Sequence, residues 1–312
     1  MVEAPRAYLQ GAKFAGILTY PEKMPPQIEL KGNEPAGTAL REILFNCLQG
    51  VIKSQQEFLD QPDEPEKLHQ FRVKLRKLRA MFSFSRPFIN QSKYIEFQEK
   101  LRQLGMELAY LRELDVLAAE WAKIQNSQED YQKLAVLAGV LREKRSVAIS
   151  QVREKLLCGR ATRPLLEFWA LLLDNYWEEI LRPAVSIADF AEGRLKSWFK
   201  KFSKEWEVID VTDHAAIHRL RIKGKKLRYA IENVKLFFKE NTHAVANTLE
   251  TIQKQLGNLH DNYRNLMLVH ELLAESAIPE LHYEAGILIG WQASQTNDLR
   301  DKLKNYHFKL PF

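Results

Sequence analysis

The chain has 312 residues, of which 46% are hydrophobic and 28% are charged, and its formal net charge is +6. This composition is typical of a globular protein with a substantial core, and it excludes a disordered or fibrous chain. The most apolar stretch, residues 165–177, contains two acidic residues and is too short to cross a bilayer. We expect no membrane span and no signal peptide, and two cysteines without a metal or redox spacing favour a reducing, cytoplasmic location.

Nearly all of the chain is predicted to be helical, because apolar residues recur at spacings of three and four. A proline-containing leader, residues 1–35, is predicted to be irregular. Asp63 with Glu66, and later Thr212 or Asp213, are the expected caps of two helix starts. The helices are expected at residues 36–60, 65–86, 91–124, 128–157, 163–181, 185–206, 212–239, 243–275 and 279–306.

Positive charge is concentrated in two of these helices. Residues 66–79 contain six Lys or Arg against one Glu, and residues 217–228 contain six Lys or Arg and no acidic residue. The two segments together carry more positive charge than the net +6, so the rest of the chain is mildly acidic. This distribution is typical of a protein that binds a polyanion, although a charged segment can also be a solvated helix face.

The two basic segments belong to an internal repeat. A shift of 149 residues aligns His69 with His218, and the basic positions that follow coincide through Arg79 and Arg228. At a shift of 148, "LAYLRELD" (108–115) resembles "LGNLHDNY" (256–263). Two similar halves of about four helices each are therefore predicted: repeat 1 at about residues 36–160, a connecting helix at about 161–182, and repeat 2 at about 183–307.

Helical geometry orders the charges within each segment. His69, Arg72, Arg76 and Arg79 fall within about 80° of one helix face, whereas Lys74 and Lys77 fall outside that arc. The apolar residues of both helices fall on another face and are the predicted core contacts: Phe71, Leu75, Leu78 and Phe82, and later Leu220, Leu227 and Ile231. Arginine suits phosphate because its planar guanidinium forms bidentate, charge-assisted hydrogen bonds.

Two questions stay open at this point. Four acidic residues could neutralise the basic faces inside a bundle, in place of an external anion: Glu107, Glu113, Asp115 and Asp261. The two aligned histidines, His69 and His218, either contact an anion or brace the helices.

The doubled pattern H-x-x-R-[VI]-x-x-[RK]-K-L-R, followed by "LRELDV" and "LGNLHD", resembles the CHAD family (conserved histidine α-helical domain). The resemblance implies that residues 36–312 form a CHAD domain. It implies an all-α fold of two pseudo-symmetric four-helix bundles packed around a basic central groove or channel. It also implies binding of inorganic polyphosphate, at polyphosphate granules or beside polyphosphate-metabolising proteins.

The residues that match the family's motif are the predicted binding residues for polyphosphate. In repeat 1 they are His69, Arg72, Arg76, Lys77, Arg79 and Arg112, and in repeat 2 they are His218, Arg221, Lys225, Lys226 and Arg228. Glu113 stands where the family has Asp after the position of Arg112, which weakens any salt-bridge role carried over to it. No catalytic residue, cofactor or metal is predicted, so we expect a binding protein for storage, localisation or regulation of polyphosphate.

Three alternatives remain. Basic helices also neutralise nucleic acids, but neither basic segment interleaves aromatic residues for base stacking. A metal-dependent phosphohydrolase is suggested only by the short spacings His260–Asp261 and His214/His218. A histidine phosphorelay protein would use one exposed histidine per bundle, without a surrounding set of arginines.

Overall fold

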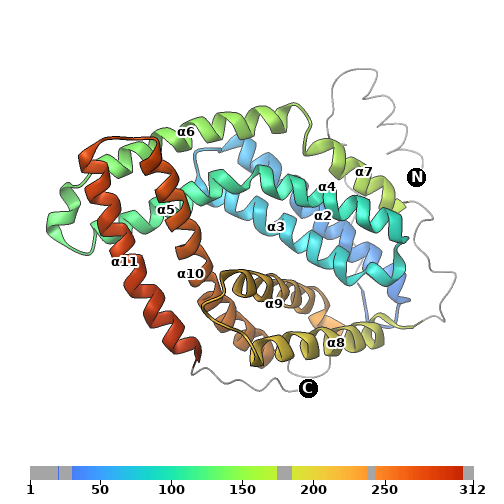
Figure 1. Cartoon of the computed structure of the whole chain (residues 1–312). Coiled ribbons are helices and arrows are strands. Elements are labelled where there is room, and N and C mark those ends of the chain that lie inside the picture. Colours follow the sequence, from blue (N-terminus) through green and yellow to red (C-terminus); the bar gives the residue numbers. More distant parts are fainter. Residues whose placement is uncertain (1–19, 21–29, 174–184, 238–242, 305–312) are drawn as a thin grey trace. The chain divides into compact units, whose positions relative to one another are not determined.

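A computed structural model describes residues 20, 30–173, 185–237 and 243–304, with the side chains of residues 243–246 and 304 excepted (Figure 1). No β-strand occurs in these ranges, and the predicted all-α fold is confirmed. The packing of two bundles around a basic groove stays a prediction. The α-helices are α2 (Ala36–Asp60), α3 (Pro65–Phe84), α4 (Gln91–Glu107), α5 (Ala109–Gln125), α6 (Val136–Leu157), α7 (Thr162–Leu173), α8 (Ile187–Glu207), α9 (His214–Val234), α10 (His243–Ala274) and α11 (Pro279–Lys304), and the 3-10 helices are η1 (Arg86–Phe88), η2 (Glu129–Lys133) and η4 (Lys235–Phe237).

The helices form two compact units, each of which combines stretches from both repeats. Among the described residues, unit 1 contains the chain up to Leu108, Gln151–Trp198 and the segment from Lys226 to the gap at 238–242. Unit 2 contains Ala109–Ser150, Phe199–Lys225 and the segment after that gap. The predicted leader lies largely outside the described residues, and residues 30–35 are not helical.

In unit 1, four helices form a closed bundle in which α2 packs on α3, α3 on α4, α4 on α7 and α7 on α2 (Figure 1). The helix that was predicted only as a connection is thus the fourth member of this bundle. Its Phe168 ring lies 5.0 Å from that of Phe82 and 5.6 Å from that of Phe97, edge to face. Phe58 of α2 and Phe71 of α3 are fully buried in the same unit.

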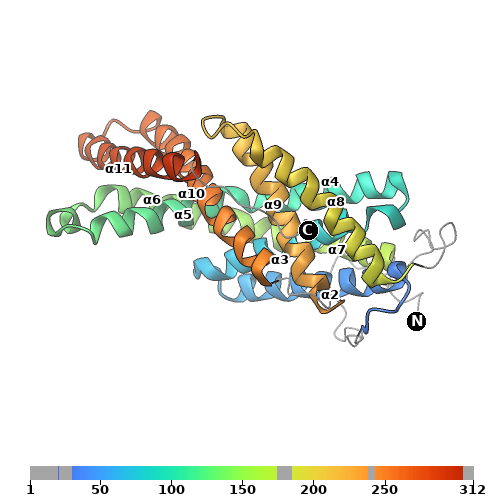
Figure 2. The ribbon, with the colours of Figure 1, turned by 90° about the horizontal axis from the view of Figure 1, so that it is seen from below.

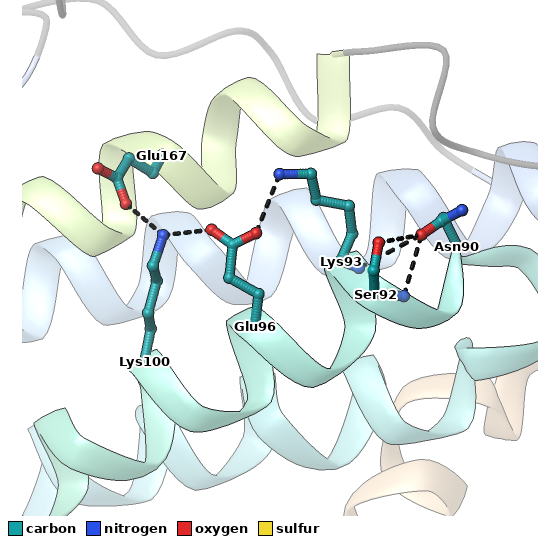
Figure 3. Close-up of polar contacts among 6 residues, drawn as sticks. All are labelled: Asn90, Ser92, Lys93, Glu96, Lys100 and Glu167. Atoms are coloured by element: carbon teal, nitrogen blue, oxygen red, sulfur yellow. Dashed lines mark hydrogen bonds and ion pairs between the residues drawn. The ribbon is translucent and has the colours of Figure 1, made fainter.

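The contact between α4 and α7 is also polar (Figure 3). Lys100 of α4 donates to Glu96 on its own helix at 2.6 Å and to Glu167 of α7 at 2.8 Å, while Lys93 donates to Glu96 at 2.9 Å. The hydrogen bonds from Lys100 and Lys93 lower the pKa of the Glu96 carboxyl group. Asn90 caps the start of α4 by accepting from two backbone N–H groups.

Unit 2 is built on α5, α10 and α11, each of which contacts the other two. Figure 2 shows α10 and α11 side by side. Trp121 of α5 is fully buried, as are Leu256 of α10 and Leu288 of α11. The core of this unit therefore joins helices from both repeats.

Several helix boundaries, and one predicted cap, differ from the prediction. The predicted helix 91–124 is broken at Leu108 into α4 and α5, and the predicted helix 128–157 becomes η2 followed by α6. The predicted cap Asp63 is wrong, because α3 begins at Pro65 with Glu64 as its cap residue and without a side-chain cap hydrogen bond. For α9 the prediction is confirmed, since Asp213 accepts from the N–H groups of Ala215 and Ala216.

The start of α6 is fixed by a carboxylate from a distant part of the chain. Glu284 of α11 accepts from the N–H of Val136 at 3.0 Å and from that of Leu137 at 2.7 Å, and it is almost completely buried. A carboxylate at a helix start satisfies orphan N–H groups and interacts favourably with the helix dipole.

We expect Glu284→Ala to destabilise the protein by about 1–3 kcal/mol, because two N–H groups at the start of α6, one of them buried, lose their acceptor. Thermal unfolding of Glu284→Ala and of Glu280→Ala, an exposed acidic residue in the first turn of α11, measures the difference. Equal melting temperatures for the two variants would contradict the role of Glu284 as the cap of α6.

Candidate anion-binding site

The first basic face lies on α3, and its helix orients it as predicted. Phe71, Leu75 and Leu78 are buried, and Lys74 is exposed. The predicted binding residues of this helix are all half-buried, and we call them the first ladder: His69, Arg72, Arg76, Lys77 and Arg79.

Lys77 differs from the arginines of the first ladder. Lys77 and Lys74 are the cations that act on the thiol of Cys47 on α2, whose pKa burial raises to about 11. This places Lys77 toward α2, which agrees with its position outside the predicted arc.

Arg72 binds the end of the neighbouring helix. Its Nη1 donates to the backbone carbonyl of Gly105 at 2.8 Å. Gly105 lies in the last turn of α4, where carbonyl groups need a donor from outside the helix. Arg72 thereby stabilises the helix end that precedes the break at Leu108, which the sequence pattern did not predict.

Arg76 and Arg79 have a different environment. Neither forms an ion pair with a described residue, and neither guanidinium donates to a helix end among these residues as Arg72 does. Both side chains are half-buried, and their Nε atoms are buried without a hydrogen-bond partner, as are those of other arginines in both basic segments. Burial, followed by the charge of Arg102, lowers the pKa of the Arg79 guanidinium. The charge of Glu99 opposes this effect without forming an ion pair with Arg79. Holding half-buried guanidinium groups without an ion-pair partner is costly, and a bound anion would offset that cost.

Most of the acidic residues that could have neutralised the ladders pair elsewhere. Glu107 pairs with Arg160 at 3.4 Å. Asp115 pairs with Arg145 at 2.7 Å. Glu113 binds Arg264 through both carboxylate oxygens, at 2.8 and 2.9 Å from the Nη2 atom. The fourth candidate, Asp261, pairs with the predicted binding residue Arg221. The charge of Arg112 also acts on Asp115. Among the ion pairs of the described residues, Glu107, Glu113 and Asp115 therefore have partners outside the two basic segments.

The second ladder consists of His218, Arg221, Lys225, Lys226 and Arg228 on α9. Its apolar face is buried as predicted, at Leu220, Leu227 and Ile231.

Two arginines of the second ladder have acidic neighbours. Arg221 pairs with Asp261 of α10 at 3.3 Å. Arg228 pairs with Glu232 at 3.6 Å and lies 5.1 Å from the centre of the Tyr229 ring. The second ladder is thus more neutralised by the protein than Arg76 and Arg79 are.

His218 faces a second histidine across α9 and α10. The Nδ1 atoms of His218 and His260 lie 3.4 Å apart, and the ring centres are 4.6 Å apart. Burial and the charges of Arg221, Lys225 and Arg264 lower the pKa of both rings, that of His260 to about 3. We call His218, Arg221, Lys225, His260 and Arg264 the α9–α10 cluster.

His260 and Arg264 were not among the predicted binding residues. The internal repeat could have identified His260, because the shift of 148 residues aligns it with Arg112, which is one of the predicted binding residues. Arg264 follows four residues later on the same face of α10. Arg112 itself lies on α5, where its charge helps to lower the pKa of the Asp115 carboxyl, although burial raises that pKa overall.

His214 and His218 do not act as a pair in this structure. The His214 ring stacks on Tyr263 with ring centres 4.1 Å apart, whereas His218 faces His260. The described residues contain no group of three His, Cys, Asp or Glu side chains arranged to hold a metal ion.

Within the part of the chain that the structure describes, no helix has the length and apolar character required to cross a membrane.

Comparison with known proteins supports the resemblance seen in the sequence. The chain is similar to the crystal structure of the CHAD domain from the plant Ricinus communis, with 24% identity, a TM-score of 0.74, and coverage of 93% of this chain and 98% of that chain. It is also similar to PptA from Streptomyces chartreusis, with 14% identity, a TM-score of 0.64, and coverage of 87% and 98%. No curated protein matches the chain. The family model of the CHAD domain matches residues 42–269, most of the chain including both ladders, and the protein therefore belongs to the CHAD domain family.

Proposed function

We propose that this protein binds inorganic polyphosphate, without catalysis, through the two ladders. One observation carries the proposal: Arg76 and Arg79 are half-buried and form no ion pair with any described residue. Guanidinium groups in this state favour an external anion that supplies several acceptor oxygens.

The arrangement of the cations favours a linear anion over a compact one. The basic residues follow one another along a helix at spacings of three and four, one turn apart, and the pattern occurs on both α3 and α9. A chain of phosphates offers a charge at each step along such a row. Membership in the CHAD domain family supports the same ligand.

The role that follows is the storage, localisation or regulation of polyphosphate in the cytoplasm or at polyphosphate granules. Polyphosphate itself, and the proteins that make or degrade it, are the proposed partners. The proposal includes neither a cofactor nor a metal ion.

A competition assay tests the ligand. Fluorescently labelled long-chain polyphosphate is bound to the protein and displaced by unlabelled polyphosphate, tripolyphosphate, ATP, RNA or DNA at several salt concentrations. We expect long-chain polyphosphate to compete best at moderate salt, because every phosphate along it can meet a cation and the ladders lack stacking aromatics. RNA or DNA that displaced the label as well as polyphosphate does would favour a nucleic-acid-binding protein.

The same samples test the absence of catalysis. Polyphosphate recovered after incubation with the protein, with and without Mg²⁺, is expected to keep its length on a gel. Shortened chains would show that the protein is a hydrolase.

A further inference from the structure

The contact between His218 and His260 restricts how the two rings are protonated. With their Nδ1 atoms 3.4 Å apart, one ring can donate an N–H to the bare Nδ1 of the other. Protons on both Nδ1 atoms would set two N–H groups against each other, and protonation of both rings would bring two imidazolium charges into contact. The pair can therefore take up one additional proton, with one ring charged and donating to the neutral ring, but not two.

The charged groups around the pair and its neighbour His214 come from four helices. Arg221 and Lys225 on α9 and Arg264 on α10 are the cations that act on both rings. Asp261 of α10 pairs with Arg221, and Glu113 of α5 pairs with Arg264, so each acid is held by an arginine. On α11, Arg300 acts on the neighbouring His214.

This environment disfavours protonation of either ring, because it places the pKa of each below its usual value. A phosphate chain on the α9–α10 cluster would offset the charges of Arg221, Lys225 and Arg264, and would thereby raise both pKa values. Proton uptake and anion binding at this cluster are then linked.

We propose that the His218–His260 pair takes up one proton when a polyphosphate chain binds the α9–α10 cluster, so that affinity rises as the pH falls. This inference rests on the proposed function. The proton comes from the solvent and resides on an imidazole nitrogen of the pair, where it adds one positive charge beside the anion.

The repeat supplies a sharp test of the linkage. The position of His260 is occupied by Arg112 in repeat 1, where the charge does not titrate near neutral pH. His260→Arg therefore gives repeat 2 a permanent charge, and His260→Asn gives it none. His270→Asn is the matched control, because His270 is an exposed histidine on the same helix.

The experiment measures the dissociation constant of labelled long-chain polyphosphate for the four proteins from pH 5.5 to 7.5. Long chains are used because their internal phosphates do not titrate in this range. We expect the affinity of the wild type and of His270→Asn to rise by about tenfold as the pH falls through this range. Both His260 variants should lose this rise, with His260→Arg binding tightly and His260→Asn weakly across the range. Proton uptake on binding, measured at pH 6.5 in weakly buffered solution, should fall by about half a proton in both variants, which is the uptake that a tenfold change over two pH units requires.

Two results would count against different proposals. Tight binding with the same pH dependence and proton uptake in all four proteins would overturn the proton linkage and leave the proposed function intact. No binding by the wild type at any pH would overturn the proposed function itself. Melting curves without ligand identify any variant that is unfolded, and the remaining His260 variant then decides the outcome.

Discussion

The variant Arg76→Gln/Arg79→Gln is expected to bind long-chain polyphosphate about two to four orders of magnitude more weakly than the wild type. Each guanidinium is expected to form charge-assisted hydrogen bonds with phosphate, and a hydrogen bond to a charged group contributes about 1.5–3 kcal/mol. The folded protein should keep its stability, because neither residue forms an ion pair with a described residue. Titration of labelled polyphosphate, together with thermal unfolding in its absence, measures both effects.

The matched control is Lys53→Gln/Lys74→Gln, which removes the same net charge from two exposed lysines of α2 and α3. It should weaken binding only slightly, through the overall charge of the protein. Equal losses for the two double variants would mean that binding depends on net charge and not on the first ladder. A lowered melting temperature for Arg76→Gln/Arg79→Gln alone would show that these arginines stabilise the fold.

The variant Arg145→Met is expected to lose about 3–5 kcal/mol of unfolding free energy at pH 7. Its partner Asp115 has a side chain that is only 1% exposed. Removing Arg145 takes away the ion-pair partner of this buried carboxylate and leaves only the charge of Arg112 acting on it. Thermal or urea unfolding measures the loss. Arg142→Met is the control, because Arg142 is exposed on the same helix.

The dependence of this loss on pH follows from the Asp115 carboxyl. Burial already raises its pKa, and Arg145 opposes that effect, so the pKa should rise further in Arg145→Met. A folded-state pKa above the unfolded one favours the protonated form in the folded protein. Stability is therefore lost as the pH rises through the folded pKa, and the difference between wild type and variant should shrink on acidification from pH 7 to 5. A difference that stays constant would contradict an uncompensated carboxylate as the cause.

The sequence was sufficient to predict features that depend on neighbours along the chain. The buried faces of α3 and α9 followed from spacing alone, and the cap at Asp213 followed from residue type and position. Each of these depends on residues within one or two helical turns, where the geometry is fixed by the helix itself.

Features that depend on distant residues could not be predicted in this way. The break at Leu108 lies beside a carbonyl bound by Arg72, and α6 begins where Glu284 supplies an acceptor. Likewise, the arginine with which an acidic residue forms an ion pair can lie on a helix that is far away in the sequence. Periodicity along one helix contains no information about these partners.

The division of the chain into units affects how the protein can be made. If the chain is cut between the repeats, within residues 161–182, neither fragment contains a whole unit. Unit 1 requires residues from Lys226 onward, and unit 2 includes Ala109–Ser150 together with segments of repeat 2. During synthesis, unit 1 therefore stays incomplete until more than two thirds of the protein has left the ribosome. Contacts between residues so far apart slow folding and leave apolar helix faces exposed in the meantime. The duplicated halves have thus become mutually dependent parts of one polypeptide, each needing the other before its own core can close.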